Sequence, residues 1–258
     1  MKLIQYVRLL KFRYHLSFIC VITGALIFSD QSLFTLIKQL LILYISFNVL
    51  LYGGLYALND IADIESDRKH PKKKYRPLPS KSISVLSALT FAFIFMIIGL
   101  AVSYFYFGRV MFLMYLLFIL VNQVYTHVAK KIPYVEILVN SLTYPMRFFL
   151  GVLLVTGKVP YFLLIAVLLI AFGFACVRRI IEKRAPGWEA RHVLKYYTEA
   201  KLIVIQIITL SLILVVLVID YPFYIIWYLV IILLYLLFVF GIHFSEQFVR
   251  FYKWLFLN

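Results

Sequence analysis

Charged residues are scarce in this chain, and acidic ones are scarcest. Only 14% of its 258 residues are charged, 11 are Asp or Glu, and 64% are hydrophobic. A soluble domain does not have this composition. Apolar stretches of about 20 residues, each long enough to cross a bilayer, recur from one end to the other. We therefore predict one polytopic membrane domain over residues 1–258.

Cysteine is nearly absent. Cys20 and Cys176 lie far apart in apolar runs, which predicts two buried hydrophobic side chains and neither a disulfide nor a thiolate metal site. The N-terminal segment carries Lys2, Arg8, Lys11 and Arg13 before its apolar run, as a signal peptide does. No small-residue cleavage site follows, so we expect an uncleaved first helix.

The net charge of +15 raises the possibility of nucleic-acid binding. The basic residues, however, lie between apolar runs, where the positive-inside bias accounts for most of them, so we predict no nucleic-acid partner. Eight spans put all but four of the 26 Lys and Arg residues on one side, the exceptions being Lys38, Arg109, Arg147 and Lys158. We predict a multi-pass cell-membrane protein whose N-terminus, loops 59–82 and 178–201 and C-terminal tail are cytoplasmic.

Eight apolar segments are predicted to form the membrane helices. They cover about residues 16–28, 33–58, 83–107, 110–128, 134–155, 160–184, 202–219 and 223–244, the last after the turn Asp220-Tyr221-Pro222. Gly53-Gly54 permits close approach of a neighbouring helix, and Ser82 or Ser84 is expected to cap the third helix. The tail, residues 245–258, is too short to span, and its aromatic pattern predicts an interfacial helix.

One stretch gathers the rare acidic residues. On a helix, Asp60, Asp63 and Asp67 fall within about 60° of one another, whereas Glu65 points away. Like charges at this spacing repel, so either a Lys/Arg shell or a divalent cation must offset them. Oxygen ligands suit Mg²⁺ bound together with substrate phosphates, and Asn59 adds a neutral oxygen or amide donor. The alternative is an acidic helix end without a function.

Basic side chains follow the acidic stretch and recur after the sixth helix. As a clamp they would neutralise a diphosphate; as an alternative, they serve only orientation and attraction to anionic lipid headgroups. The second polar segment contains no aspartate, and Arg178 and Glu182 lie four residues apart, where they can pair. The predicted substrate-binding residues here are Lys73, Arg76, Arg178, Arg179, Glu182, Arg191 and Tyr197.

Arg147 lies inside the fifth apolar segment, two residues after Pro145. An intramembrane arginine is costly, so a functional role in substrate binding is the default expectation. Glu136 is a candidate partner on the same helix, but its separation of eleven residues is too long for a direct pair. The alternative is that Arg147 snorkels to an interface.

The spacing Asn59-Asp60-x-x-Asp63-x-x-x-Asp67 resembles the aspartate motif of the UbiA superfamily of intramembrane prenyltransferases, and its position after the second helix matches as well. The resemblance implies an all-α bundle of about eight or nine transmembrane helices around a central cavity open to the cytoplasmic side. It also implies that Asp60, Asp63 and Asp67 are catalytic and bind Mg²⁺. The ninth helix would be reduced to the tail, absent or replaced by a partner.

The second motif departs from quinone-type members, which carry further aspartates after helix 6. Arg178-Arg179-Ile180-Ile181-Glu182, together with the extension Arg68-x-His70-Pro71-x-Lys73-x-x-Arg76-Pro77, is similar to the branch that includes decaprenyl-phosphate phosphoribosyltransferase. The resemblance implies Mg²⁺-dependent transfer of phosphoribose from phosphoribosyl diphosphate to a polyprenyl phosphate. This donor and acceptor bring three anionic groups, which the basic second segment suits.

Two other functions remain open. A prenyltransferase that moves a polyprenyl chain from its diphosphate to an aromatic or lipid acceptor would keep the same fold and first motif. An anion transporter would fit Arg147 and the basic loops, but clustered aspartates would not help an anion to permeate. The sequence predicts no oligomeric state.

Overall fold

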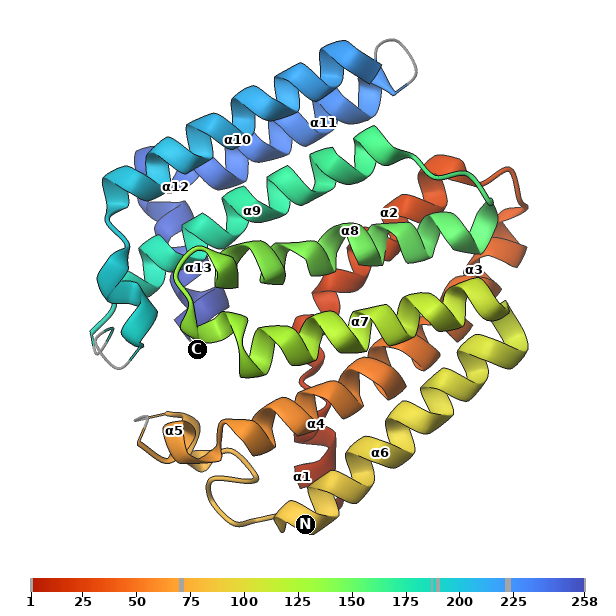
Figure 1. The fold of residues 1–258 in the computed structure, drawn as a ribbon, viewed down its shortest axis with the longest axis vertical. Coiled ribbons are helices and arrows are strands. Elements are labelled where there is room, and N and C mark those ends of the chain that lie inside the picture. Colours follow the sequence, from red (N-terminus) through yellow and green to blue (C-terminus); the bar gives the residue numbers. More distant parts are fainter. Residues whose placement is uncertain (1, 70–71, 187, 189–190, 221–223, 258) are drawn as a thin grey trace. The chain divides into compact units, whose positions relative to one another are not determined.

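The computed structural model describes residues 2–69, 72–186, 188, 191–220 and 224–257. His70 and Pro71 of the extended motif, and Tyr221 and Pro222 of the last predicted turn, lie outside the described residues. Across the described ranges every regular element is a helix and there is no strand (Figure 1). The prediction of an all-α protein is therefore confirmed.

Seven of these helices are long and apolar enough to cross a membrane, and an eighth apolar helix, Phe12–Phe28, is shorter. The seven cover Leu33–Ala62, Val85–Phe107, Arg109–Lys131, Val135–Val155, Tyr161–Lys183, Glu199–Asp220 and Ile225–Phe244. Together with the shorter helix they correspond to the eight predicted spans, and they indicate a multi-pass membrane protein. The second span extends four residues beyond its predicted end, because Asn59 and Asp60 continue the helix.

The chain divides into two compact units, which we describe separately. Unit 1 consists of residues 1–122 and 146–158, and unit 2 of residues 123–145 and 159–258. The helices α7 (Arg109–His127) and α8 (Val135–Val155) contribute residues to both. That residues 1–258 form a single domain stays a prediction.

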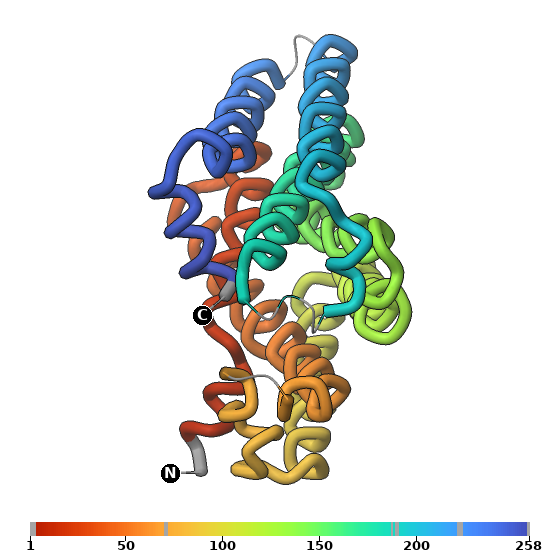
Figure 2. The backbone as a smooth tube through the Cα atoms, turned by 90° about the vertical axis from the view of Figure 1, so that its left-hand side faces the viewer, coloured from red at the N-terminus to blue at the C-terminus, as the bar shows by residue number. Residues whose placement is uncertain are grey.

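Unit 1 contains the N-terminal helices and the acidic motif. Besides its parts of α7 and α8, its elements are α1 (Lys2–Leu9), η1 (Phe12–Phe18), α2 (Ile19–Phe28), α3 (Leu33–Leu43), η2 (Tyr44–Tyr52), α4 (Gly53–Ala62), α5 (Ile64–Lys69), η3 (Lys73–Tyr75), α6 (Val85–Val102) and η4 (Ser103–Phe107). Its core includes the aromatic side chains of Phe47, Tyr115 and Phe118. In Figure 2 the red N-terminal helix and the orange segment of α5 and η3 lie at the same end of this unit.

The second span is not a uniform α-helix. Its middle segment η2 is π-helical, between α3 and α4. The hydroxyl groups of Ser46 and Tyr115 lie 2.8 Å apart, which ties η2 to α7. On the other side α6 approaches closely at Gly99, where a methyl carbon would lie 2.8 Å from the carbonyl oxygen of Ser46. The π-helical segment is thus held by neighbouring helices.

Glycines allow close helix crossings in unit 1, as Gly53-Gly54 predicts. A methyl carbon on Gly54 would lie 2.7 Å from the carbonyl oxygen of Ala92 in α6. The predicted cap of the next helix is also confirmed, since Ser84 accepts the N–H of Ser87 at 3.1 Å. The close contact at Gly54 therefore places α6 beside α4, the helix that carries the start of the acidic motif.

A stability test follows from the crossing of α2 and α8. A methyl carbon on Gly151 would overlap the carbonyl oxygen of Val21 and lie 2.8 Å from the amide nitrogen of Ala25. We expect Gly151→Ala to lower the unfolding free energy by about 1–3 kcal/mol, the usual cost of overpacking, measured by thermal unfolding in detergent. Gly157→Ala is the control, because no atom lies within 4 Å of its added carbon. Equal melting of both variants would contradict this packing.

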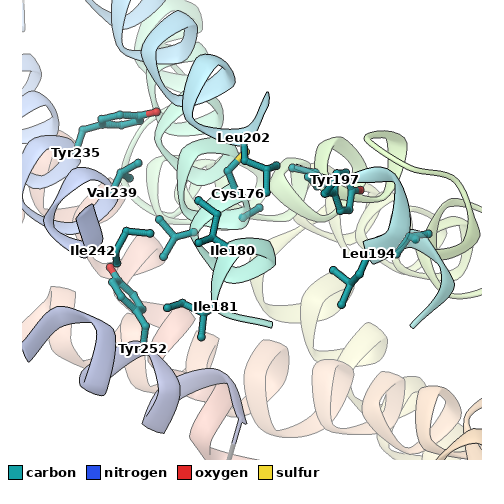
Figure 3. Packing of buried hydrophobic residues seen from close by; sticks show 14 of the residues in the cluster. Cys176, Ile180, Ile181, Leu194, Tyr197, Leu202, Tyr235, Val239, Ile242 and Tyr252 are labelled. Atoms are coloured by element: carbon teal, nitrogen blue, oxygen red, sulfur yellow. The ribbon is translucent and has the colours of Figure 1, made fainter. Parts of the chain in front are cut away.

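Unit 2 packs its helices around a second core. Besides its parts of α7 and α8, its elements are η5 (Ala129–Lys131), α9 (Tyr161–Lys183), η7 (His192–Tyr196), α10 (Glu199–Asp220), α11 (Ile225–Leu234), η8 (Tyr235–Phe240), α12 (Gly241–Phe244) and α13 (Glu246–Leu257). Figure 3 shows Cys176, Ile180 and Ile181 at the centre of this core, with Tyr197 and Leu194 on one side and Tyr252 and Ile242 on the other. Both Cys20 and Cys176 are free, although Cys20 is only half-buried.

The tail forms the short helix α13, as predicted. Tyr252 is buried and its hydroxyl donates to the carbonyl oxygen of Phe238 at 2.9 Å. Trp254 on the same helix is exposed. One face of α13 therefore packs on the protein, which the expectation of an interfacial helix did not include.

Candidate functional site

The acidic motif keeps a helical course despite a break at Asp63. Asp63 ends α4 with φ −95° and ψ 1°. Its amide still bonds the carbonyl of Asn59 at 3.0 Å, and the amide of Asp67 bonds the carbonyl of Asp63 at 2.8 Å. Asp60 and Asp67 are buried, whereas the side chain of Glu65 is 81% exposed. The predicted division of this stretch into two faces is confirmed for these residues.

Cationic side chains surround the two buried carboxylates. Lys11 Nζ lies 2.5 Å from Asp60 Oδ1, and Arg76 Nη1 lies 2.7 Å from Asp67 Oδ2 and 3.5 Å from Asp60 Oδ1. Lys73 Nζ lies 3.8 Å from Asp67 Oδ1. Burial would lower the pKa of Arg76, but Asp60 and Asp67 raise it above its ordinary value, so the guanidinium stays charged. The motif therefore has a Lys/Arg shell, one of the two predicted counter-charges.

The other predicted counter-charge is a metal ion. Among the described residues no group of three or more His, Cys, Asp and Glu side chains is arranged to hold one. Asp60 and Asp67, however, share the same guanidinium nitrogen and so converge. Two carboxylates with substrate phosphates are a usual ligand set for Mg²⁺, so this pair fits the ion. Asp63 as a ligand and Asn59 as a donor stay predictions.

Arg147 is buried inside unit 1. Its side chain is 2% exposed, so it does not reach the protein surface as a snorkelling arginine would. The guanidinium lies over the rings of Tyr52 and Phe118, 4.6 Å and 4.7 Å from their centroids. Desolvated cation–π contacts of this kind stabilise an arginine in a low-dielectric interior. Its role in substrate binding stays a prediction.

The second polar segment forms a buried ion-pair network in unit 2. Arg179 Nε donates to Glu136 Oε1 at 2.5 Å, and a second nitrogen of Arg179 pairs with the other oxygen of Glu136. Arg179 also pairs with Glu182 at 2.5 Å. Both Arg179 and Glu136 are fully buried. Because a buried charge requires pairing, Arg179 is held by the protein's own carboxylates.

Two further residues of the predicted site join this network. Arg191 Nη2 lies 3.2 Å from Glu136 Oε2, and the Tyr197 hydroxyl donates to Glu136 Oε1 at 3.0 Å. Burial and the adjacent carboxylate of Glu136 raise the pKa of Tyr197, so its hydroxyl stays a donor at neutral pH. Glu136 thus connects the start of α8, the end of α9 and the segment around η7.

Arg178 occupies a different position from Arg179. Its Nε donates to Glu182 Oε1 at 2.8 Å, which confirms the predicted pair, and its side chain is 31% exposed. Its guanidinium lies 5.7 Å from the centroid of the Phe256 ring in α13. A ligand at the surface of unit 2 would therefore meet Arg178 before Arg179.

Sequence reasoning missed two of the residues that organise these clusters. The sequence marks Lys11 only as one of the basic residues of the N-terminus, and no pattern signals its pairing with Asp60, 49 positions away. The sequence indicates Glu136 only as a candidate partner of Arg147, whereas its partners in the structure are Arg179, Arg191 and Tyr197. The rarity of acidic residues in the apolar segments is the one signal that marks Glu136.

Comparison with known proteins gives a consistent family match. A model of the UbiA prenyltransferase family matches residues 17–254. Digeranylgeranylglyceryl phosphate synthase of Methanococcus vannielii is 38% identical over 104 residues, 40% of this chain and 34% of that protein. Decaprenyl-phosphate phosphoribosyltransferase of Mycobacterium tuberculosis is 31% identical over 124 residues, 47% of this chain and 39% of that protein. The chain thus spans little more than a third of the length of these relatives.

Solved structures match over almost the whole chain. A UbiA homolog from Archaeoglobus fulgidus bound to GPP and Mg²⁺ has a TM-score of 0.77 at 18% identity, and the match covers 98% of this chain and 95% of that one. At this identity the likeness establishes the fold alone. The predicted bundle type is thereby confirmed.

Proposed function

We propose, since this chain belongs to the UbiA prenyltransferase family, that it is an integral membrane transferase which takes a group from a diphosphate donor held with Mg²⁺ and passes it to a lipid acceptor. The observation that carries this proposal is the convergence of Asp60 and Asp67 on Arg76, with Lys11 and Lys73 beside them. Carboxylates for a divalent cation and cations for phosphate oxygens thus occur together. This is the composition that a Mg²⁺–diphosphate requires.

We propose that the group transferred is phosphoribose, and that the acceptor is a polyprenyl phosphate. Such a pair of substrates brings a diphosphate, a sugar phosphate and a lipid phosphate. The second polar segment supplies Arg178, Arg179 and Arg191 and no aspartate, and planar guanidinium groups suit phosphate oxygens. Because Glu136 and Glu182 offset part of this charge, the partly exposed members Arg178 and Arg191 would contact the substrate.

The proposed reaction is a substitution at the anomeric carbon of the ribose. The bond from this carbon to the diphosphate oxygen breaks, its electron pair leaves with the diphosphate, and an oxygen of the lipid phosphate forms the new bond. Asp60 and Asp67 would hold Mg²⁺, which supplies charge neutralisation to the leaving group. Lys11, Lys73 and Arg76 would bind its remaining oxygens. The acceptor is already an anion, so no strong general base is required.

Prenyl transfer is the second candidate. The relative in Methanococcus vannielii is named a digeranylgeranylglyceryl phosphate synthase, and the Archaeoglobus fulgidus structure holds GPP. Such an enzyme would use the same aspartates with a prenyl diphosphate donor. We rank it second because the arginines after α9 exceed what a single diphosphate needs. An anion transporter ranks lowest, since it gives the converging aspartates no role.

We further propose that the N-terminus, residues 59–82 and 178–201 and the tail face the cytoplasm, because 20 of the 26 Lys and Arg residues lie in those segments. Donors such as phosphoribosyl diphosphate are water-soluble and would enter from that side. The acceptor lipid would enter from the bilayer.

The donor is tested directly with the purified protein in nanodiscs. Labelled phosphoribosyl diphosphate, or a labelled prenyl diphosphate, is supplied with a polyprenyl monophosphate and Mg²⁺. We expect the ribose label to enter the lipid phase, and to stop doing so when EDTA removes the metal. Transfer of the prenyl label alone would replace the first candidate by the second. Transfer of neither label would contradict both.

A further inference from the structure

Lys11 has a backbone conformation that lysine rarely adopts. It lies just after the end of α1 with φ 49° and ψ 53°, in the left-handed region. A helix that ends in a left-handed residue usually has glycine there, because a Cβ atom makes this conformation costly. The ammonium of Lys11 is nevertheless the group that pairs with Asp60 at 2.5 Å, and its side chain is only 15% exposed. Backbone strain of this kind persists only where the surrounding structure imposes it.

His15 holds the peptide bond that precedes Lys11. Its Nε2 lies 3.1 Å from the carbonyl oxygen of Leu10, and because a carbonyl only accepts, Nε2 is the donor. This carbonyl belongs to the planar peptide between Leu10 and Lys11, so its direction is coupled to the φ angle of Lys11. The side chain of Leu10 packs directly on α4, since a methyl carbon on Gly53 would lie 2.6 Å from its Cδ2 atom. Both the carbonyl and the side chain of Leu10 are thus held, and they impose the left-handed turn.

His15 is itself attached to the membrane span that carries Asp60. Its other nitrogen, Nδ1, lies 2.8 Å from the hydroxyl oxygen of Tyr44. Tyr44 begins η2, and Asp60 lies in α4 of the same span. The rings of His15 and Tyr44 also meet edge-on, with 5.5 Å between their centroids, and His15 is buried. A buried imidazole with a partner at each nitrogen has a fixed orientation, so His15 connects the turn at Lys11 to the helix that carries its carboxylate.

We infer that His15 is a positioning residue, which holds the carbonyl of Leu10 and with it the left-handed backbone of Lys11, so that the Lys11 ammonium reaches Asp60. Its consequence for catalysis rests on the proposed function, in which Lys11 binds an oxygen of the diphosphate. Without the hydrogen bond from His15, the peptide between Leu10 and Lys11 can turn. Lys11 then regains the ordinary backbone region with negative φ, and its ammonium moves away from Asp60.

The position of the Lys11 ammonium is tested by its chemical reactivity, which requires no substrate. The protein in nanodiscs of phosphatidylcholine is pulsed with formaldehyde and cyanoborohydride, and mass spectrometry gives the rate of methylation at Lys11. We expect His15→Leu to raise this rate about tenfold, the factor that relief of one left-handed residue provides. Lys158, which is exposed in the same unit, is the internal reference. An unchanged rate at Lys11 would overturn the inference.

Two further variants separate the hydrogen bond from the bulk of the side chain. In His15→Gln the amide nitrogen is as many bonds from the backbone as Nε2 of histidine and can still donate to Leu10, so we expect the slow rate at Lys11 to be kept. In His15→Asn the amide is one bond shorter and does not reach that carbonyl, so we expect the fast rate. Equal rates in these two variants would contradict a role of the hydrogen bond.

The action of His15 through Lys11 is tested by calorimetric titration with pyrophosphate in the presence of Mg²⁺. His15→Leu and Lys11→Met are each expected to weaken binding about tenfold, and the double variant to bind as Lys11→Met alone does, because the two residues act as one unit. Arg8→Met is the control, since Arg8 is exposed on α1 and bonds to Gln5. Additive losses in the double variant would overturn the inference. If the reactivity of Lys11 responds as expected while pyrophosphate does not bind, the positioning role stands and the proposed function fails.

Discussion

Asp60→Asn is expected to lower kcat/KM for lipid transfer by at least about 100-fold, because metal neutralisation of a leaving group contributes several kcal/mol and about 1.4 kcal/mol corresponds to a factor of ten. Asp60 is buried and forms ion pairs with both Lys11 and Arg76. Its replacement removes one of two carboxylates that would hold Mg²⁺. The measurement is initial rate against Mg²⁺ concentration, with thermal unfolding to verify the fold.

Glu65→Gln is the matched control for that variant. It makes the same change of charge five residues away, on the exposed side of the motif, where Glu65 pairs with Arg68 at 2.6 Å. We expect its rate and its Mg²⁺ dependence to equal those of the unchanged protein. Full activity of Asp60→Asn, or an equal loss in both variants, would refute a metal site at the buried aspartates.

Glu136→Gln is expected to have the largest effect on stability. Removing one partner of a buried ion pair costs about 3–5 kcal/mol, and Glu136 has three partners in Arg179, Arg191 and Tyr197. The variant should unfold at a lower temperature. Hydrogen exchange should also accelerate in residues 192–196, since the flanking side chains of Arg191 and Tyr197 lose their common acceptor.

Glu199→Gln provides the comparison. Its pair with Arg184 is partly exposed, with a separation of 2.7 Å, and exposed pairs contribute about 0–1 kcal/mol. A similar fall in melting temperature for Glu136→Gln and Glu199→Gln would mean that the buried network does not stabilise unit 2. Unchanged exchange in residues 192–196 would show that Glu136 does not hold this segment.

The sequence predicts the helices well because each apolar run must be long enough to cross a bilayer. The predicted ends lie within about four residues of the observed ones. The largest changes, of four residues each, are at the start of the first apolar helix, which begins at Phe12, and at the end of the second span, where the polar residues Asn59 and Asp60 join the helix. Hydropathy does not detect this extension, because Asn59 and Asp60 are polar, although Ile61 beside them packs against a core cluster of unit 1. The same limit hides the π-helical turns, which depend on packing against neighbouring helices.

The sequence predicts those contacts of the site that join residues close to one another along the chain. The phase of a helix predicts that Asp60 and Asp67 share a face, and i,i+4 spacing predicts the pair of Arg178 and Glu182. Ion pairs between segments that are far apart in the sequence produce no such spacing pattern. Lys11 with Asp60 and Glu136 with Arg179 are joined only by the fold, so the sequence does not show that the protein's own glutamates pair with Arg179. The role of Arg179 in substrate binding stays a prediction.

The π-helical segment Tyr44–Tyr52 lies before the acidic motif in the same span. Each residue of an α-helix turns the chain by about 100°, so deleting one residue from α4 would swing Asp60 away from Lys11. A π-helical turn bonds i to i+5 and holds one residue more than an α-helical turn, so a one-residue deletion in Tyr44–Tyr52 would be absorbed by its return to α-helix and would leave the facing of the motif unchanged. In an alignment of distant members, a one-residue gap in this segment is therefore compatible with equivalent aspartates, whereas a gap in α4 is not.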